Sequence, residues 1–348
     1  MRIDVHTHFV PPEFLADARR GRALDNVLVH RQDGTEWLVH PQGFRYRLVP
    51  EIWDVEAKLR HMDSLGIDVA VVSLSPTLFF YWLEVGPAQQ FCQSANEALA
   101  KFVSQSGGRL HGMAIVPLQQ PEAAALELRR AVTELGLRGA LIGTTVENVP
   151  LDDQRFGSFF AMAAELGVPI VPHPYYVGIR PHLADYYMTN LTGNPLETCI
   201  AASRLILSGF LDRHPNLIIV LVHAGGFMPY QIGRLDHGFR VRAETCADVK
   251  SPPSSYLRRF WYDTITHASI PLRFLIELVG SDRVVLGTDI PFDMADTHFE
   301  EYLSAAELDR QALEAITGGN AMRIFGLDSR SIPNSVTEMP PGRQGFTA

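Results

Sequence analysis

Short apolar runs alternate along the chain with longer stretches in which apolar residues recur at helical spacing. The short runs are rich in branched and aromatic residues and predict eight β-strands. These predicted strands are Arg2–Val5, Asp68–Ser73, Leu110–Val116, Arg138–Gly143, Pro169–His173, Leu217–His223, Phe260–Thr264 and Arg283–Asp289. Strands that alternate with helices in this way are typical of repeated βα units and a parallel sheet.

The stretches between these runs predict eight helices. In Asp54–Leu65, the apolar residues Val55, Leu59 and Met62 share one helical face, and Gly66 follows as a typical helix stop. The other predicted helices are Ala88–Gln105, Glu122–Leu135, Phe156–Leu166, Glu197–Gly209, Pro229–Thr245, Pro271–Val279 and Ala306–Gly318. Eight strands and eight helices favour an α/β fold of the (β/α)8 TIM-barrel type over a doubly wound open sheet.

Two segments lie outside this alternation. Residues 10–52 contain Asp33-Gly34, a hairpin-type turn between two β-like pieces, Asn26–His30 and Trp37–His40. We interpret residues 10–52 as a small antiparallel insertion after the first strand, at the barrel mouth. Residues 329–348 are rich in Pro, Ser and Gly without periodicity, which indicates a C-terminal tail. We therefore expect one domain over residues 1–328.

Composition and charge narrow the class of protein. The chain has 348 residues, of which 46% are hydrophobic and 20% charged, as in ordinary globular proteins and unlike disordered ones. No run approaches the ~18 apolar residues of a membrane helix, and the net charge of −9 argues against nucleic-acid partners. Three widely spaced cysteines, and an N-terminus without the apolar core of a secretory signal, favour a cytoplasmic location.

Several polar residues stand at the ends of the predicted strands. His6 and His8 follow the first strand at i and i+2, so their side chains point to the same face. His173, His223 and Asp289 each end another predicted strand. Barrel active sites are built at this carboxyl end, and buried imidazole or carboxylate groups without partners are costly. Ligation of one cation explains their convergence more simply than separate structural roles do.

These residues resemble those of a known family. The His6-x-His8 pair, His173 in Val-Pro-His-Pro, His223 in His-Ala-Gly-Gly and Asp289 in Leu-Gly-Thr-Asp-Ile-Pro-Phe are similar to the amidohydrolase superfamily. Within it, the chain resembles the decarboxylase branch typified by α-amino-β-carboxymuconate-ε-semialdehyde decarboxylase. The resemblance runs from residue 1 to about residue 326.

The resemblance implies a single divalent metal ion, usually Zn²⁺, held by His6, His8, His173 and Asp289. Three imidazoles and one carboxylate suit Zn²⁺, and an open coordination position marks a catalytic site. The resemblance also implies that His223 acts as general base and then as general acid. The only lysines are Lys58, Lys101 and Lys250, and none follows a predicted strand, which excludes a lysine-bridged binuclear site.

The resemblance further implies substrate-binding residues. Arg234 matches an arginine that reaches a substrate carboxylate from a neighbouring subunit, which predicts a homodimer. Arg45 matches an arginine of the insertion, but the spacing to Trp53 is one residue longer here, so Arg47 is an alternative. A surface or dimer-interface ion pair remains open for Arg234, and a solvated hairpin side chain remains open for Arg45. Aromatic residues that could sandwich a planar substrate are Trp53, Tyr175, Tyr186, which replaces the family's usual tryptophan, and Phe292, the favoured pocket wall.

The expected function is metal-dependent, non-oxidative decarboxylation of a small planar carboxylic acid. The substrate would be of the carboxymuconate semialdehyde or the hydroxybenzoate type, and its conjugated system would serve as electron sink without an organic cofactor. The His-x-His pair favours the semialdehyde, since several phenolic-acid decarboxylases of this branch have glutamate at the first histidine. One alternative is a hydrolase or hydratase acting on a lactone, amide or unsaturated acid, with Asp289 protonating the leaving group. The other is a catalytically inactive binding module.

Overall fold

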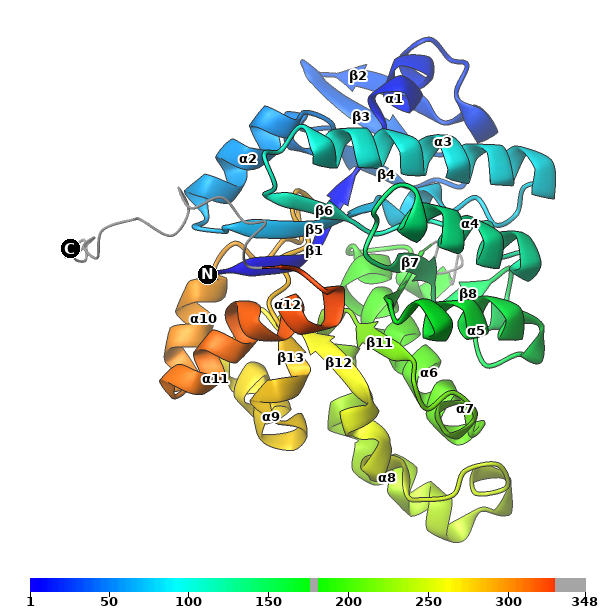
Figure 1. Cartoon of the computed structure of the whole chain (residues 1–348), viewed down its shortest axis with the longest axis vertical. Helices are drawn as coiled ribbons and strands as arrows, with labels where there is room; N and C mark the ends of the chain where they lie inside the picture. The colour runs from blue at the N-terminus through cyan, green and yellow to red at the C-terminus, as the bar shows by residue number, and fades with distance from the viewer. Residues whose placement is uncertain (176–180, 329–348) are drawn as a thin grey trace.

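Eight parallel strands form the centre of the computed structural model, which describes residues 1–175 and 181–328 (Figure 1). Each strand begins within two residues of a predicted strand, which confirms the expected α/β alternation. The strands are β1 (Ile3–Phe9), β5 (Val69–Leu74), β6 (Leu110–Gly112), β7 (Ala140–Gly143), β10 (Pro169–His173), β11 (Ile218–Leu221), β12 (Phe260–Asp263) and β13 (Val284–Val285).

The parallel strands form two sheets, in the orders β1-β5-β6 and β13-β12-β11-β10-β7. Backbone hydrogen bonds connect the sheets at both pairs of edges. At one pair, Val5 N–H donates to the Leu286 carbonyl at 2.9 Å, and His8 N–H donates to the Ile290 carbonyl at 2.9 Å. At the other pair, Ala114 N–H donates to the Gly139 carbonyl at 2.8 Å. The carboxyl ends of the strands of both sheets therefore lie next to one another.

Most helices lie where the apolar spacing predicts them. They are α2 (Val55–Ser64), α3 (Val85–Ser104), α4 (Pro121–Thr133), α5 (Gly157–Leu166), α6 (Asn194–Leu207), α8 (Met228–Val241) and α9 (Ser269–Val279). Gly66 follows α2 with a φ of 65°, as expected for a residue that ends a helix. The helices α1 (Pro12–Arg19) and α7 (Phe210–Arg213) are additional to the prediction.

The helix predicted over Ala306–Gly318 is wrong in its bounds. The structure has α10 (Phe299–Ala305), then a break, then α11 (Arg310–Glu314) and α12 (Asn320–Phe325), which a π-helical turn connects. The break has a local cause, because the Asp309 carboxylate accepts a hydrogen bond from Ala312 N–H at 2.7 Å and so caps a new helix.

The segment after β1 contains a three-stranded antiparallel sheet made of β2 (Leu28–Gln32), β3 (Thr35–Val39) and β4 (Arg45–Arg47). Asp33 and Gly34 connect β2 to β3 with φ values of 50° and 77°, the left-handed pair that a tight hairpin requires. A second hairpin is formed by β8 (Thr145–Val146) and β9 (Val149–Pro150). The predicted tail, residues 329–348, lies outside the described residues.

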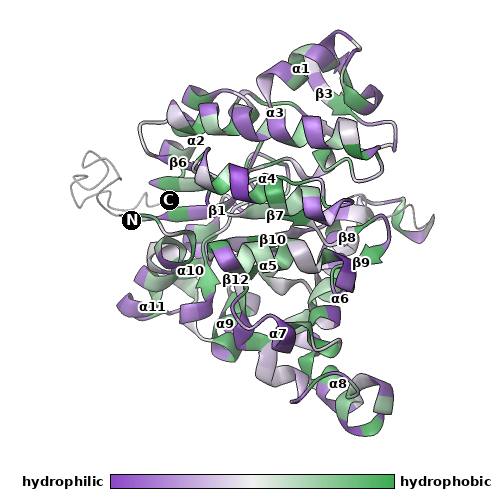
Figure 2. Ribbon diagram, turned by 45° about the vertical axis from the view of Figure 1, so that its right-hand side comes forward, coloured by the Kyte–Doolittle hydropathy of each residue, from purple (hydrophilic) through white to green (hydrophobic). Residues whose placement is uncertain are grey.

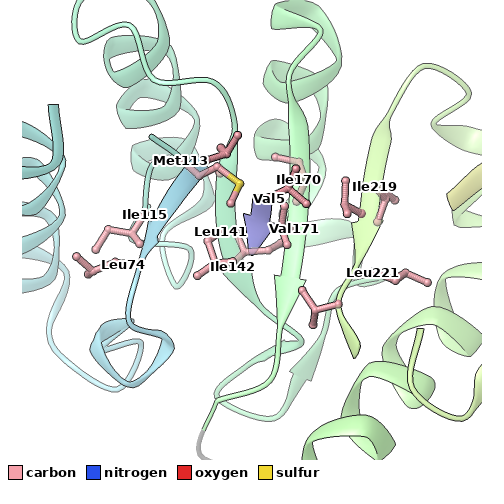
Figure 3. Packing of buried hydrophobic residues seen from close by; sticks show 14 of the residues in the cluster. Val5, Leu74, Met113, Ile115, Leu141, Ile142, Ile170, Val171, Ile219 and Leu221 are labelled. Carbon is pink, nitrogen blue, oxygen red and sulfur yellow. The ribbon is translucent and has the colours of Figure 1, made fainter. Parts of the chain in front are cut away.

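The core lies on and around the parallel strands. Figure 3 shows buried apolar side chains of this core, among them Val5 of β1, Leu141 of β7 and Val171 of β10. In Figure 2 the strands are largely green (hydrophobic), whereas the surrounding helices mix hydrophobic and hydrophilic residues, as amphipathic helices that cover a buried sheet do. None of the described helices is long and apolar enough to span a membrane.

We expect Leu141→Ala to lower the free energy of unfolding by about 2–5 kcal/mol, because it leaves a cavity where Leu141 is 1% exposed. Leu126→Ala is the matched control, since Leu126 on α4 is 67% exposed and its loss should change stability by less than about 0.5 kcal/mol. Urea unfolding followed by circular dichroism measures both. Equal shifts for the two variants would contradict the packing described above.

Candidate metal centre

The four predicted metal ligands meet at the carboxyl ends of their strands. His6 and His8 belong to β1, His173 ends β10, and Asp289 follows β13. The ring centroid of His6 lies 5.1 Å from that of His8 and 5.1 Å from that of His173. One possible ligand atom from each of the four residues lies within 4.8 Å of the other three, and all four residues are buried. The structure thus brings together the whole predicted ligand set.

The Nδ1 atom of each of these histidines has a hydrogen-bond partner outside the cluster. These contacts are His6 Nδ1 to Asp263 Oδ2 at 2.8 Å, His8 Nδ1 to the Leu74 carbonyl at 3.2 Å and His173 Nδ1 to the Pro174 carbonyl at 2.6 Å. Carbonyl and carboxylate oxygens accept, so they favour the proton on Nδ1 and leave the Nε2 lone pair available. Such partners fix the orientation of metal-binding imidazoles.

The Nε2 atoms of the three histidines and Oδ1 of Asp289 are buried and have no hydrogen-bond partner among the described residues. Asp289 Oδ1 lies 3.0 Å from His8 Nε2 and 3.5 Å from His6 Nε2. Buried polar atoms without partners are costly, and here they all face one point. Three imidazole nitrogens and a carboxylate oxygen are a donor set that suits Zn²⁺ and related divalent ions. The residues present therefore fit a single metal ion.

Asp4 holds Asp289 beside the histidines. Its carboxylate accepts hydrogen bonds from His6 N–H at 3.0 Å and from the N–H and hydroxyl of Thr288 at 3.1 and 2.7 Å. Asp289 N–H in turn donates to the His6 carbonyl at 2.6 Å. Asp4 was not assigned a role from the sequence, although it stands two residues before His6.

His223 lies beside the cluster, with its ring centroid 5.7 Å from that of His6 and 5.3 Å from that of His173. Its backbone φ is 54°, in the left-handed region, and the turn continues through Ala224 and two glycines. A Cβ atom at Gly226 would overlap the carbonyl oxygen of Pro195, so the small residues after His223 are a steric requirement of this turn. His223 Nδ1 is buried without a hydrogen-bond partner in the described ranges.

Asp263, at the end of β12, links His223 to the metal ligands. Besides binding His6 Nδ1, its carboxylate accepts hydrogen bonds from the backbone N–H groups of His223 at 3.0 Å and Ala224 at 2.7 Å. Sequence reasoning missed this residue. The available signal was its position, since Asp263 is the next-to-last residue of the predicted strand Phe260–Thr264.

Burial and neighbouring charges set the protonation of these groups. Burial lowers the pKa of His8 and His173, and it lowers the pKa of His223 to about 4, so His223 is neutral near pH 7. Burial opposes ionisation of Asp289, yet His6 and His8 hold the pKa of this carboxyl well below its usual range. Against the effect of burial, Asp289 and Asp263 raise the pKa of His6. The carboxylates therefore favour positive charge at this point.

A cavity of about 680 Å³ opens beside His223 and Asp289. Its volume is in the usual range for small-molecule sites, ~300–1,000 Å³. Its walls come largely from α6, α8, α9 and the segments next to them, and most are apolar, including Phe227, Ile270 and Phe274. His267 is a further titratable residue of the lining.

Phe292 is the predicted substrate-binding residue that the structure places at the cluster. Its ring centroid lies 5.0 Å from that of His8 and 5.1 Å from that of Tyr46. Tyr46 belongs to β4 and donates a hydrogen bond from its hydroxyl to Ser75 Oγ at 3.0 Å. The insertion therefore reaches the metal cluster through Tyr46, which sequence reasoning missed.

The structure does not bring Arg45 and Arg47 to the cluster. Successive side chains of a strand point to opposite faces, so both arginines lie on the face of β4 opposite to Tyr46. Both are exposed, and Arg45 lies over the Trp37 ring, 5.0 Å from its centroid. Arg234 is exposed on α8, and Tyr186 is 89% exposed. Among the described residues, none of these four lines the cavity.

Parallel strand ends that converge on a buried cluster of three imidazoles and one carboxylate define the class of metal-dependent α/β enzymes. The amidohydrolase family model matches residues 3–327. The chain belongs to the amidohydrolase family, which confirms the family expected from its motifs.

Individual relatives are decarboxylases. The 2-amino-3-carboxymuconate-6-semialdehyde decarboxylase of Dictyostelium discoideum is 32% identical over 332 residues, covering 94% of this chain and 92% of that protein. The γ-resorcylate decarboxylase of Rhodococcus jostii (strain RHA1) is 32% identical over 350 residues, covering 94% and 99%. The crystal structure of dihydroxybenzoic acid decarboxylase from Polaromonas sp. JS666, with bound manganese and 2-nitroresorcinol, has a TM-score of 0.72 and 25% identity, covering 95% and 98%.

These relatives confirm the expected decarboxylase branch and a divalent metal as its cofactor. They include enzymes of both expected types, the carboxymuconate semialdehyde type and the hydroxybenzoate type. Membership of the family also implies the TIM-barrel fold.

We expect Asp263→Asn to weaken Zn²⁺ binding about 10- to 100-fold, because the amide removes the charge that orients His6 and disturbs the turn at His223. The dissociation constant is measured by competition with a chromogenic chelator, and circular dichroism checks the fold. Asp282→Asn removes a half-exposed carboxylate that pairs with Arg258, and it serves as the control. Identical Zn²⁺ dissociation constants for the two variants would refute the role of Asp263.

Proposed function

We propose that the chain catalyses the metal-dependent, non-oxidative decarboxylation of a small planar carboxylic acid. The observation that carries the proposal is the buried cluster of His6, His8, His173 and Asp289, with neutral His223 beside it and a largely apolar cavity next to both. The decarboxylases among the relatives support the same reaction.

In this proposal the four ligands hold one divalent cation. The donor set supports Zn²⁺, and the manganese in the dihydroxybenzoic acid decarboxylase structure makes Mn²⁺ the first alternative. A cation at this point supplies a Lewis acid that stabilises negative charge on a bound oxygen. Phe292 forms a wall next to His8, against which a planar ring can pack.

His223 moves the proton. Because it is neutral near pH 7, it can accept a proton from a substrate hydroxyl or from water. His223 then returns this proton to the carbon that bears the carboxylate and so forms the new C–H bond. The bond between that carbon and the carboxylate breaks, CO₂ leaves, and the electron pair returns to the conjugated system of the substrate. Where water supplies the proton, the hydroxide left behind combines with the CO₂ to give hydrogencarbonate. Asp263 keeps the backbone of His223 in place during both transfers.

We also propose the finer architecture of this enzyme. The parallel strands close into one barrel domain over residues 1–328, and the insertion at residues 10–52 covers part of its mouth. The backbone hydrogen bonds at both edges of the two sheets support closure, and the contact of Tyr46 with Phe292 supports the place of the insertion. Three free cysteine thiols, Cys92, Cys199 and Cys246, support a reducing compartment such as the cytoplasm.

A homodimer is part of the proposal. The helix α8 projects from the body of the molecule in Figures 1 and 2. Exposed apolar side chains of the cavity rim are Tyr230 on α8 (78% exposed) and Ile270 on α9 (70%). Exposed apolar surface of this kind marks interaction sites. Arg234 follows Tyr230 by four residues and so shares its helix face, where it can reach the cavity of a second copy.

The decisive experiment measures CO₂ release by Zn²⁺- and Mn²⁺-loaded protein from carboxymuconate semialdehydes and ortho-hydroxybenzoates. We expect turnover of at least one substrate, loss of turnover after chelation and its return when metal is added back. His223→Asn should lower kcat about 10²- to 10⁴-fold, because it removes the proton carrier, with metal content unchanged. If metal-loaded wild-type protein instead hydrolyses lactones or amides without releasing CO₂, the decarboxylase proposal is wrong and the hydrolase alternative holds.

A mixing experiment tests the contribution of Arg234 in trans. Alone, Arg234→Ala and His223→Ala should each be nearly inactive on a substrate with two carboxylates. After exchange of subunits in an equal mixture, half of the dimers are mixed, and one of their two sites has both residues intact, so activity should recover to about a quarter of wild type. Absence of recovery, with subunit exchange verified by mass spectrometry, would contradict the shared site.

A further inference from the structure

Lys58 is a lysine buried next to the metal ligands. It lies on α2 and is 0% exposed, which is rare for an ammonium group because its desolvation is costly. Its Nζ donates hydrogen bonds to Thr7 Oγ1 at 2.8 Å and to the His8 carbonyl at 3.0 Å. Asp4 and Glu51 supply the negative charge that acts on it. Lys58 thus holds the backbone of His8 and the side chain of Thr7, which lies between His6 and His8 in the sequence.

Thr7 carries this connection to a second strand end. Its Oγ1 accepts from Lys58 and donates to the Ile290 carbonyl at 2.7 Å. The same carbonyl accepts from His8 N–H at 2.9 Å, and Ile290 directly follows Asp289. Lys58, Thr7 and Ile290 therefore form a chain of hydrogen bonds, here named the Lys58 relay, that joins α2 to the two segments that supply His8 and Asp289.

The backbone of β1 is irregular at the point where the relay holds it. The register between β1 and β5 shifts between Asp4 and Thr7, so the regular strand pairing is interrupted next to His6. Side-chain hydrogen bonds can replace the constraint that a regular ladder would supply. The Nε2 of His8 and Oδ1 of Asp289, the ligand atoms on either side of the relay, approach to 3.0 Å.

We propose that Lys58 is a positioning residue of the metal centre, which acts through Thr7 to hold His8 and Asp289 at the spacing that one ion requires. Lys58 itself neither ligates the ion nor touches the substrate. The inference goes beyond the proposed reaction, because it concerns ligand geometry and applies whichever substrate the enzyme takes.

The test compares the Zn²⁺ dissociation constants of four single variants, measured by chelator competition on full-length protein. Lys58→Met keeps the length of the side chain and removes both donors, whereas Lys101→Met on α3 removes a lysine that is not buried. Thr7→Val breaks the relay in the middle, and Thr7→Ser keeps the hydroxyl. We expect Lys58→Met and Thr7→Val to weaken Zn²⁺ binding about 10- to 100-fold, as loss of groups behind metal ligands does. Lys101→Met and Thr7→Ser should bind like wild type.

The double variant Lys58→Met/Thr7→Val tests whether the relay acts as one unit. If it does, the double variant binds Zn²⁺ hardly more weakly than the weaker single variant. The proposal is overturned if Lys58→Met folds in its metal-free form and then binds Zn²⁺ with the dissociation constant of the wild type. If Lys58→Met does not fold, wild-type affinity of Thr7→Val overturns it instead. Failure of the wild-type protein to release CO₂ would count against the proposed function alone, since the comparison of dissociation constants stands without it.

Discussion

Three imidazole nitrogens and one carboxylate oxygen face one another in the protein interior, where polar atoms without hydrogen-bond partners cost free energy. The other residues of the site hold these four atoms in place despite that cost. These atoms are buried without a hydrogen-bond partner among the described residues, and a cation at their common focus would offset this cost. Their orientation is fixed from behind, because the other nitrogen of each imidazole binds Asp263, the Leu74 carbonyl or the Pro174 carbonyl.

The fold meets this constraint by tying separate strand ends to one another. Asp4 connects β1 to the segment after β13, and Asp263 on β12 holds both a ligand of β1 and the turn after β11. These carboxylates accept several hydrogen bonds each, so the same groups that orient the ligands also satisfy backbone N–H groups that strand pairing leaves over. The metal centre and the ends of the parallel sheet thus stabilise each other.

Sequence reasoning succeeded where a local pattern carries the information. Apolar runs that end in His173, His223 or Asp289 give both the strand and the residue placed at its end. It failed where the pairing of strands in the folded protein decides which side chains face the site. Arg45 and Arg47 matched a family pattern, but the pairing of Tyr46 with Leu38 in the β3–β4 register turns the tyrosine toward Phe292. The burial of Lys58 could not be predicted from the sequence either, because the sequence does not show that its helix passes behind β1.

The charges around the cavity relate the number of carboxylates on the substrate to the proposed homodimer. Within the described lining, the titratable side chains are His223, His267 and Asp289, and neither lysine nor arginine is among them. A substrate with one carboxylate, of the hydroxybenzoate type, needs no further cation once that group faces the metal. A second carboxylate, as in a carboxymuconate semialdehyde, would enter a largely apolar cavity unpaired, at a high desolvation cost. In the homodimer that we propose, Arg234 of the second copy would supply the cation that a dicarboxylate substrate needs and that this lining does not contain.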